Sequence, residues 1–212
     1  MNQERLETLL MTIDKMRATT IKQLMRVHDL GGYRNAAKIV KQLKPYIHEH
    51  RENEKIIYLN KHGRELIGSS HEVKHSPYIQ HILLTNEVYI YFKCPFDWRT
   101  ECPFEREEKL PKGFTLTLGN TALKSKKRVI ADAVFTRNGY LYLVEIDNIR
   151  KMQDNQKKIE TYTDLWSSIK MEFGQQPILY FFTNTINRKK KFEDWLANKR
   201  IRYEVRTFDE IR

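Results

Sequence analysis

The sequence has few of the features that mark secreted or membrane proteins. Only two cysteines occur, Cys94 and Cys102, and each is followed by proline. Their spacing matches no common zinc motif, so we expect neither a metal-binding cysteine site nor a disulfide-rich domain. The sequence also lacks a run of about 18 apolar residues and the apolar core of a signal peptide. We therefore expect a cytoplasmic protein without a membrane partner.

Acidic residues are in deficit. The 27 Asp and Glu residues are outnumbered by 38 Lys and Arg, which gives a formal net charge of +11 over 212 residues. A surface of this charge attracts polyanions, and nucleic acid is the polyanion we expect as partner. The length suits two small domains, and the polar, turn-rich stretch around Gly68 and Pro77 predicts a boundary there. We assign residues 1–70 to the first domain and 76–212 to the second.

The first seventy residues contain three segments with the apolar spacing of short helices. Leu6 to Ile13 is the first, and a second begins at Ile21 after a cap at Thr19 or Thr20. The glycines at 31 and 32 allow a sharp turn before a third helix, expected over 33–44. Three short helices with a glycine turn before the third are typical of a helix-turn-helix.

The outer face of the expected third helix is basic. Arg34, Lys38 and Lys41 recur at i, i+4 and i+7, and cations so placed suit DNA phosphates, whereas Asn and Gln suit adenine edges. A solvated helix face is the alternative. The residues that we expect to bind DNA are Lys22, Tyr33, Arg34, Asn35, Lys38, Lys41, Gln42, Lys44, Arg51 and Lys55.

A β-hairpin is expected next, with strands over 47–51 and 55–59 around a polar turn. The stretch Tyr58-Leu59-Asn60-Lys61-His62-Gly63 resembles the end of many bacterial winged-helix domains, with Asn60 as a helix cap. The resemblance implies an N-terminal winged helix-turn-helix that binds double-stranded DNA. Winged helices also mediate protein contacts, so this alternative stays open.

The second domain reads as helices alternating with strands, which predicts an α/β fold with a mixed central sheet covered by helices. We expect helices over 77–92, 151–173 and 187–199 and strands over 98–101, 114–118, 129–136, 140–146, 177–183 and 202–208.

Three acids interrupt the apolar pattern of two adjacent strands. Asp132 lies on one strand, and Glu145 and Asp147 lie two apart on the next, so the last two project from the same face. Converging carboxylates are what Mg²⁺ or Mn²⁺ needs, so these three are the expected metal ligands. The alternative is that the acids face solvent or pair with Lys157 or Lys158.

These acids resemble the core of PD-(D/E)xK nucleases, in which Asp and Glu bind metal and a Lys follows two residues after the Glu. Asp147 stands where that Lys is expected, and Lys158, or less plausibly Arg150 or Lys157, is placed to replace it. With the segment 158–162, Lys-Ile-Glu-Thr-Tyr, the motifs resemble the replication-relaxation family of plasmids, phages and conjugative elements. Ala-Asp-Ala at 131–133 departs from that family's usual Pro-Asp-Ala.

The resemblance implies a DNA-binding protein of a mobile genetic element, acting in replication, DNA processing or transcriptional control. Because Asp147 replaces the Lys, we favour a degenerate nuclease-like domain over catalysis. The alternative is a metal-dependent endonuclease with Asp132, Glu145, Asp147 and Lys158 as catalytic residues. A third reading is an assembly protein that contacts a relaxase, a replication protein or a second copy of itself, and helix-turn-helix proteins often dimerise on DNA.

Overall fold

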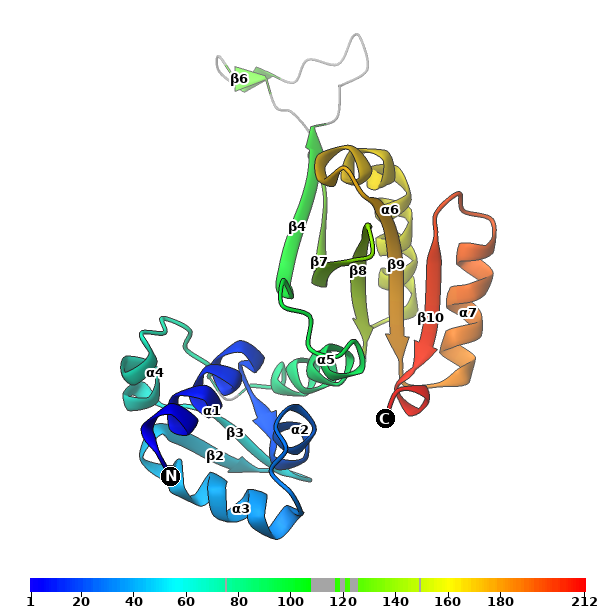
Figure 1. Cartoon of the computed structure of the whole chain (residues 1–212). Helices are drawn as coiled ribbons and strands as arrows, with labels where there is room; N and C mark the ends of the chain where they lie inside the picture. The colour runs from blue at the N-terminus through cyan, green and yellow to red at the C-terminus, as the bar shows by residue number, and fades with distance from the viewer. Residues whose placement is uncertain (75, 108–116, 119–120, 123–125, 149) are drawn as a thin grey trace. The chain divides into compact units, whose positions relative to one another are not determined.

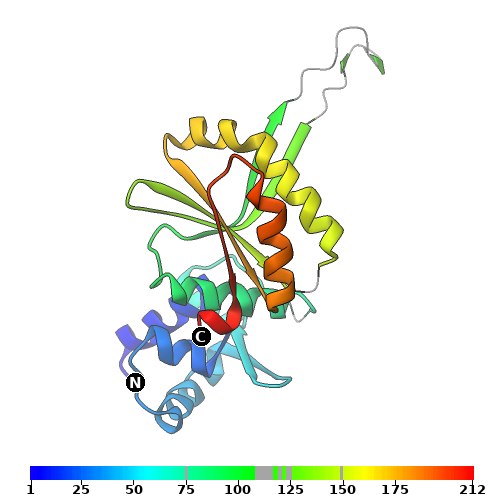
Figure 2. The ribbon, with the colours of Figure 1, turned by 90° about the vertical axis from the view of Figure 1, so that its right-hand side faces the viewer.

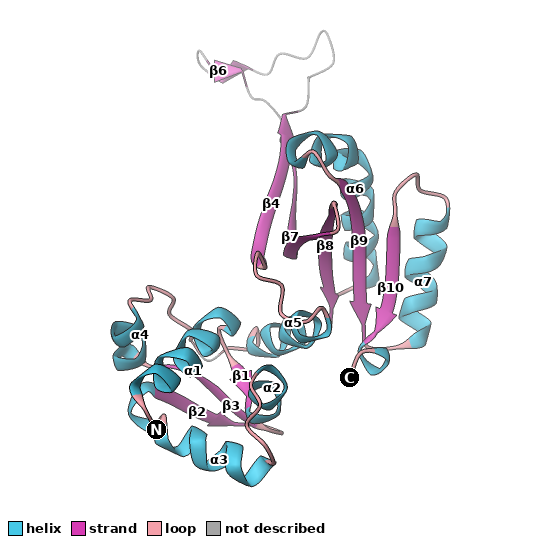
Figure 3. Ribbon diagram, in the orientation of Figure 1, coloured by secondary structure: helices cyan, strands magenta, loops and turns pink. Residues whose placement is uncertain are grey.

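The computed structural model describes residues 1–74, 76–107, 117–118, 121–122, 126–148 and 150–212. They form an α/β protein of two compact units, Met1–Cys94 and Pro95–Arg212 (Figure 1; coloured by secondary structure in Figure 3). In the part of the chain that the structure describes, no helix has both the length and the apolarity to cross a membrane.

The first unit combines helices with a small sheet. Its strands lie in the order β1-β3-β2, and both pairings are antiparallel. Its elements are α1 (Gln3–Met16), β1 (Thr19–Thr20), α2 (Ile21–Val27), α3 (Tyr33–Gln42), a 3-10 turn (Lys44–Tyr46), β2 (Ile47–Arg51), β3 (Lys55–Leu59), α4 (Lys61–Ile67) and α5 (Ile79–Tyr91).

Local sequence explains where these helices begin. Thr20 caps α2 through a capping box with Gln23, and Asn60 caps α4 by accepting from the Gly63 N–H at 2.9 Å. The apolar stripes expected from the sequence then meet in one core, because Leu10 of α1, Leu24 of α2 and the neighbouring helix and strand residues are buried together. The fold of this unit leaves the polar face of α3 outward.

Helix α5 belongs to the first unit, so the chain divides after Cys94 and not in the 70–76 segment where we expected the boundary. Asn86 donates to the carbonyls of Met16 (3.1 Å) and Ala18 (2.6 Å). Gln23 donates to the carbonyl of Leu83 (2.8 Å) and to Glu87 (2.7 Å). These hydrogen bonds satisfy buried polar groups of α5 and tie the helix to α1 and α2.

The second unit is built on a five-stranded mixed sheet in the order β10-β9-β8-β7-β4. The β4/β7 and β7/β8 pairs are antiparallel, and the β8/β9 and β9/β10 pairs are parallel. Its elements are β4 (Arg99–Glu107), β5 (Thr117–Leu118), β6 (Thr121–Ala122), β7 (Lys126–Arg137), β8 (Tyr140–Asp147), α6 (Met152–Phe173), β9 (Gln176–Thr183), α7 (Ile186–Ala197), β10 (Tyr203–Thr207) and a 3-10 turn (Phe208–Glu210). Of the strand expected over 114–118, only the part that forms β5 lies among the described residues.

Helices α6 and α7 cover the same face of this sheet (Figure 2). Leu141 and Leu143 of β8 are fully buried against them. Because side chains alternate along a strand, Glu145 and Asp147 point to this helix-covered face as well. Two acids are thereby placed under the helices, where each needs a polar partner.

Candidate functional site

The outer face of α3 carries the basic row that the sequence predicts. Arg34, Lys38 and Lys41 are all exposed, while Ala36, Ile39 and Val40 on the other face of the helix are buried. The helix therefore presents one-signed charge to solvent along its whole length.

Ion pairs divide the expected DNA-binding cations into two groups. Lys22 pairs with Glu54, and Lys55 pairs with Glu49 at 2.8 Å. The others form no ion pair with any residue that the structure describes, and they are Arg34, Lys38, Lys41, Lys44 and Arg51. The second group has the charge and exposure needed to meet phosphates.

The three uncharged residues expected at DNA differ in how free their polar groups are. Asn35 is exposed, but its amide donates to the Leu30 carbonyl at 2.8 Å, so this side chain supports the loop before α3. Gln42 and Tyr33 are exposed, Tyr33 to 53% of its surface. Gln42 thus keeps its amide available for a base edge, whereas Asn35 has one amide donor engaged.

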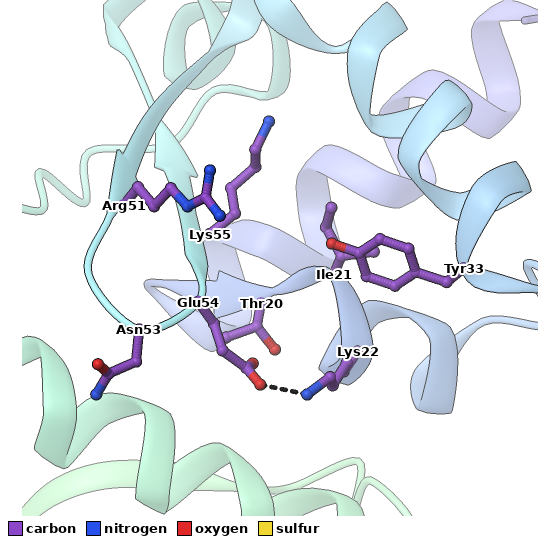
Figure 4. Close-up of a pocket in the computed structure, with 8 residues that line it drawn as sticks. All are labelled: Thr20, Ile21, Lys22, Tyr33, Arg51, Asn53, Glu54 and Lys55. Atoms are coloured by element: carbon purple, nitrogen blue, oxygen red, sulfur yellow. Dashed lines mark hydrogen bonds and ion pairs between the residues drawn. The ribbon is translucent and has the colours of Figure 1, made fainter.

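A cavity of about 350 Å³ lies between the β2–β3 hairpin and the starts of α2 and α3 (Figure 4). Four of the expected DNA-binding residues line it together with four neighbours. The lining residues are Thr20, Ile21, Lys22, Tyr33, Arg51, Asn53, Glu54 and Lys55. One of the lining residues, Tyr33, is the first residue of α3, the helix that carries Arg34, Lys38 and Lys41.

In the second unit, Asp132, Glu145 and Lys158 converge. The register of β7 with β8 ends at Ala133 opposite Val144. Just beyond this pair, the Asp132 carboxylate accepts a hydrogen bond from the backbone N–H of Ile146 at 2.7 Å. The Lys158 ammonium, from α6, contacts Glu145 and lies 3.9 Å from Asp132 Oδ1. Lys158 was the residue that we expected to replace the missing lysine.

Glu145 is buried among these groups. Its side chain also accepts from the Tyr162 hydroxyl at 2.5 Å. Burial raises the pKa of Glu145 to about 8, although the Lys158 ammonium acts in the opposite direction. Burial and the neighbouring Glu145 likewise raise the pKa of Tyr162. Burial therefore favours the protonated form of the Glu145 carboxyl, and the Lys158 ammonium favours the carboxylate.

Asp147 belongs to a different cluster, at the ends of β8 and β9. Its carboxylate accepts from Arg188 at 2.6 Å through both Nε and Nη2, from Asn155 at 2.7 Å and from Thr183 at 2.7 Å. Arg188 also donates to the Arg150 carbonyl at 2.7 Å. The hydrogen bond and charge of Asp147 raise the pKa of Arg188. Asp147 thus joins β8, β9, α6 and α7.

The three expected metal ligands are consequently not equivalent. Asp132 and Glu145 share Lys158, whereas the oxygens of Asp147 are occupied by protein donors. Within the described ranges, no group of three His, Cys, Asp or Glu side chains is arranged to hold a metal ion. The donor set therefore does not fit the three-carboxylate magnesium or manganese site that the sequence suggested.

Two residues of these clusters, Tyr162 and Arg188, are not predicted as partners from the sequence. Tyr162 was part of a family-like motif but had no assigned role, and Arg188 belonged to a basic run at the start of a helix. The available signal was topological: Asp147 and Thr183 are register partners on parallel strands, so α7, which follows β9, begins beside Asp147.

Comparison with known proteins gives one finding. A family model described as replication-relaxation matches residues 10–176, which is most of the chain and spans parts of both units. No curated protein and no solved structure matches the chain.

Proposed function

This chain belongs to the replication-relaxation family, and on that premise we propose that it is a DNA-binding protein of a mobile genetic element. It acts in replication, DNA processing or transcriptional control. The first unit serves as a winged helix whose helix α3 enters the major groove. The second unit is a PD-(D/E)xK-like domain without nuclease activity.

The observation that carries this proposal is the row of exposed, unpaired cations on α3. Arg34, Lys38 and Lys41 are spaced along one face and meet no acid among the described residues. Side chains so placed are suited to phosphates on the two sides of a groove, and Gln42 on the same helix is suited to a base edge. The order of helices and hairpin is also that of a winged helix.

We would test binding by fluorescence anisotropy with a labelled duplex of random sequence, between about 50 and 200 mM salt. The variant Arg34→Ala/Lys38→Ala/Lys41→Ala is expected to weaken binding at least about tenfold. The slope of log K against log salt is negative and should become shallower by about 2.7, because each of the three lost phosphate contacts contributes about 0.9.

The matched control removes three exposed cations outside α3, in Lys61→Ala/Lys74→Ala/Lys170→Ala. This variant has the same net charge as the test variant, and we expect its slope to change by less than about 1. Equal losses in the two triple variants would show that only overall charge matters and would contradict a groove-binding α3. Equal melting temperatures would exclude misfolding.

The proposed lack of nuclease activity rests on the partners of the acids. The residue at 147 is an acid bound to Arg188, and both Asp132 and Glu145 already accept hydrogen bonds from the protein. A positive charge at position 147, which the nuclease core uses near the reacting phosphate, is missing.

An endonuclease is the second candidate, favoured by the convergence of Asp132, Glu145 and Lys158. In such an enzyme Mg²⁺ or Mn²⁺ would supply an activated water. Incubation of the same protein preparations with supercoiled plasmid, with and without either ion, tests for endonuclease activity. We expect no nicking, and nicking that is lost in Glu145→Gln would establish the endonuclease.

A further inference from the structure

We propose that the cavity beside α3 receives a backbone phosphate of duplex DNA, and that Glu54 is a built-in competitor which this phosphate displaces from Lys22. The inference rests on the proposed DNA-binding function and adds to it a residue that limits affinity. The cavity contributes three cations and one acid among its eight described lining residues, namely Lys22, Arg51 and Lys55 against Glu54.

The side chains around the cavity have the chemistry of a phosphate site. Arg51 extends from the hairpin toward α3, and the Tyr33 hydroxyl points back toward the hairpin (Figure 4). Arg51 forms no ion pair with any described residue, so its guanidinium is available for two hydrogen bonds to phosphate oxygens. The volume of about 350 Å³ leaves room for a phosphate with its sugar.

The Lys22–Glu54 ion pair is the contact that an incoming phosphate has to replace. Both side chains are exposed, 66% for Lys22 and 44% for Glu54. Exposed pairs of this kind are weak, so an arriving phosphate can exchange for the Glu54 carboxylate at little cost. The hydrogen bond and charge of Glu54 raise the pKa of Lys22 above its ordinary value of 10.5. The ammonium is charged at neutral pH with or without Glu54.

The other acids of the hairpin do not line the cavity, although Glu49 pairs with Lys55, which does, at 2.8 Å. Glu52 accepts from Gln80 at 2.7 Å. Glu52 therefore offers a matched control, because it lies in the same turn and carries the same charge.

The experiment measures duplex binding by wild type, Glu54→Gln and Glu52→Gln at low and high salt. We expect Glu54→Gln to bind about fivefold more tightly at low salt, and Glu52→Gln to gain less than about twofold. In a Lys22→Gln background the gain from Glu54→Gln should disappear, because the two residues act on the same phosphate.

The outcomes separate the two proposals. If wild type binds DNA through α3 but Glu54→Gln and Glu52→Gln behave alike, the competitor role is overturned while DNA binding stands. If wild type does not bind DNA, both are overturned. A free deoxynucleotide monophosphate that competes with DNA, and does so better against Glu54→Gln than against Glu52→Gln, would assign the cavity to a soluble ligand and overturn the DNA phosphate.

Discussion

Glu145→Gln should change how the stability of the second unit depends on pH. Glu145 is 1% exposed, and burial raises its pKa to about 8 from an ordinary value of 4.5. Between these two pH values the unfolded carboxyl is ionised and the folded one is protonated. The folded state then binds more protons at Glu145. The contribution of this residue to the free energy of unfolding therefore falls as pH rises through this window and is constant above it.

The size of the effect follows from the same two values. A pKa difference from 4.5 to about 8 corresponds to an upper bound of about 5 kcal/mol in the free energy of unfolding. The glutamine variant has no proton to lose at this position. It should therefore match wild type near pH 4.5 and exceed it progressively up to about pH 8.

Tryptophan fluorescence during urea unfolding is the appropriate assay, because Trp98, Trp166 and Trp195 all lie in the second unit. The control is Glu105→Gln, which removes an exposed carboxylate that pairs with Lys126 at 3.1 Å. A stability difference between Glu145→Gln and wild type that does not vary with pH would refute the reasoning. It would mean that Lys158 keeps Glu145 ionised in the folded protein.

Two further changes test the packing of the units. Asp147→Ala should lower the free energy of unfolding by about 3 kcal/mol in the same assay, since it leaves Arg188 without its acid; a loss under about 1 kcal/mol would contradict the clustered role. Gly63→Ala should destabilise the first unit by about 1–3 kcal/mol, because its Cβ would lie 2.2 Å from the Tyr46 carbonyl oxygen. Gly32→Ala, whose Cβ meets nothing within 4 Å, is the control, and equal circular-dichroism melting temperatures for the two variants would show the contact to be harmless.

Local patterns predicted the elements of the fold well. The hairpin strands over 47–51 and 55–59 match β2 and β3, and the helix expected over 151–173 is α6. The strand expected over 98–101 is the much longer β4, Arg99–Glu107. Its second half carries exposed charges such as Glu105 and Arg106, so it lacks the apolar alternation of a strand and is held by pairing with β7.

Long-range contacts account for what the sequence did not predict. The turn formers near Pro77 indicate a linker, but the partners that bind α5 to the first unit, Met16 and Gln23, lie far away in the sequence. Lys158 was predicted from the resemblance to the nuclease core, which calls for a lysine beside the acids, because it lies on the helix that follows Glu145. Arg188 could not be predicted, because its contact with Asp147 depends on the parallel alignment of β8 and β9.

The Asp147–Arg188 pair also limits how this chain can vary. A change of Asp147 to lysine, which would recreate the nuclease pattern in a single step, would set two cations against each other between β8 and α7. Asn155 and Thr183 would lose their common acceptor at the same time. The route from this sequence to the nuclease pattern therefore requires coordinated substitutions at positions about forty residues apart, each harmful without the other.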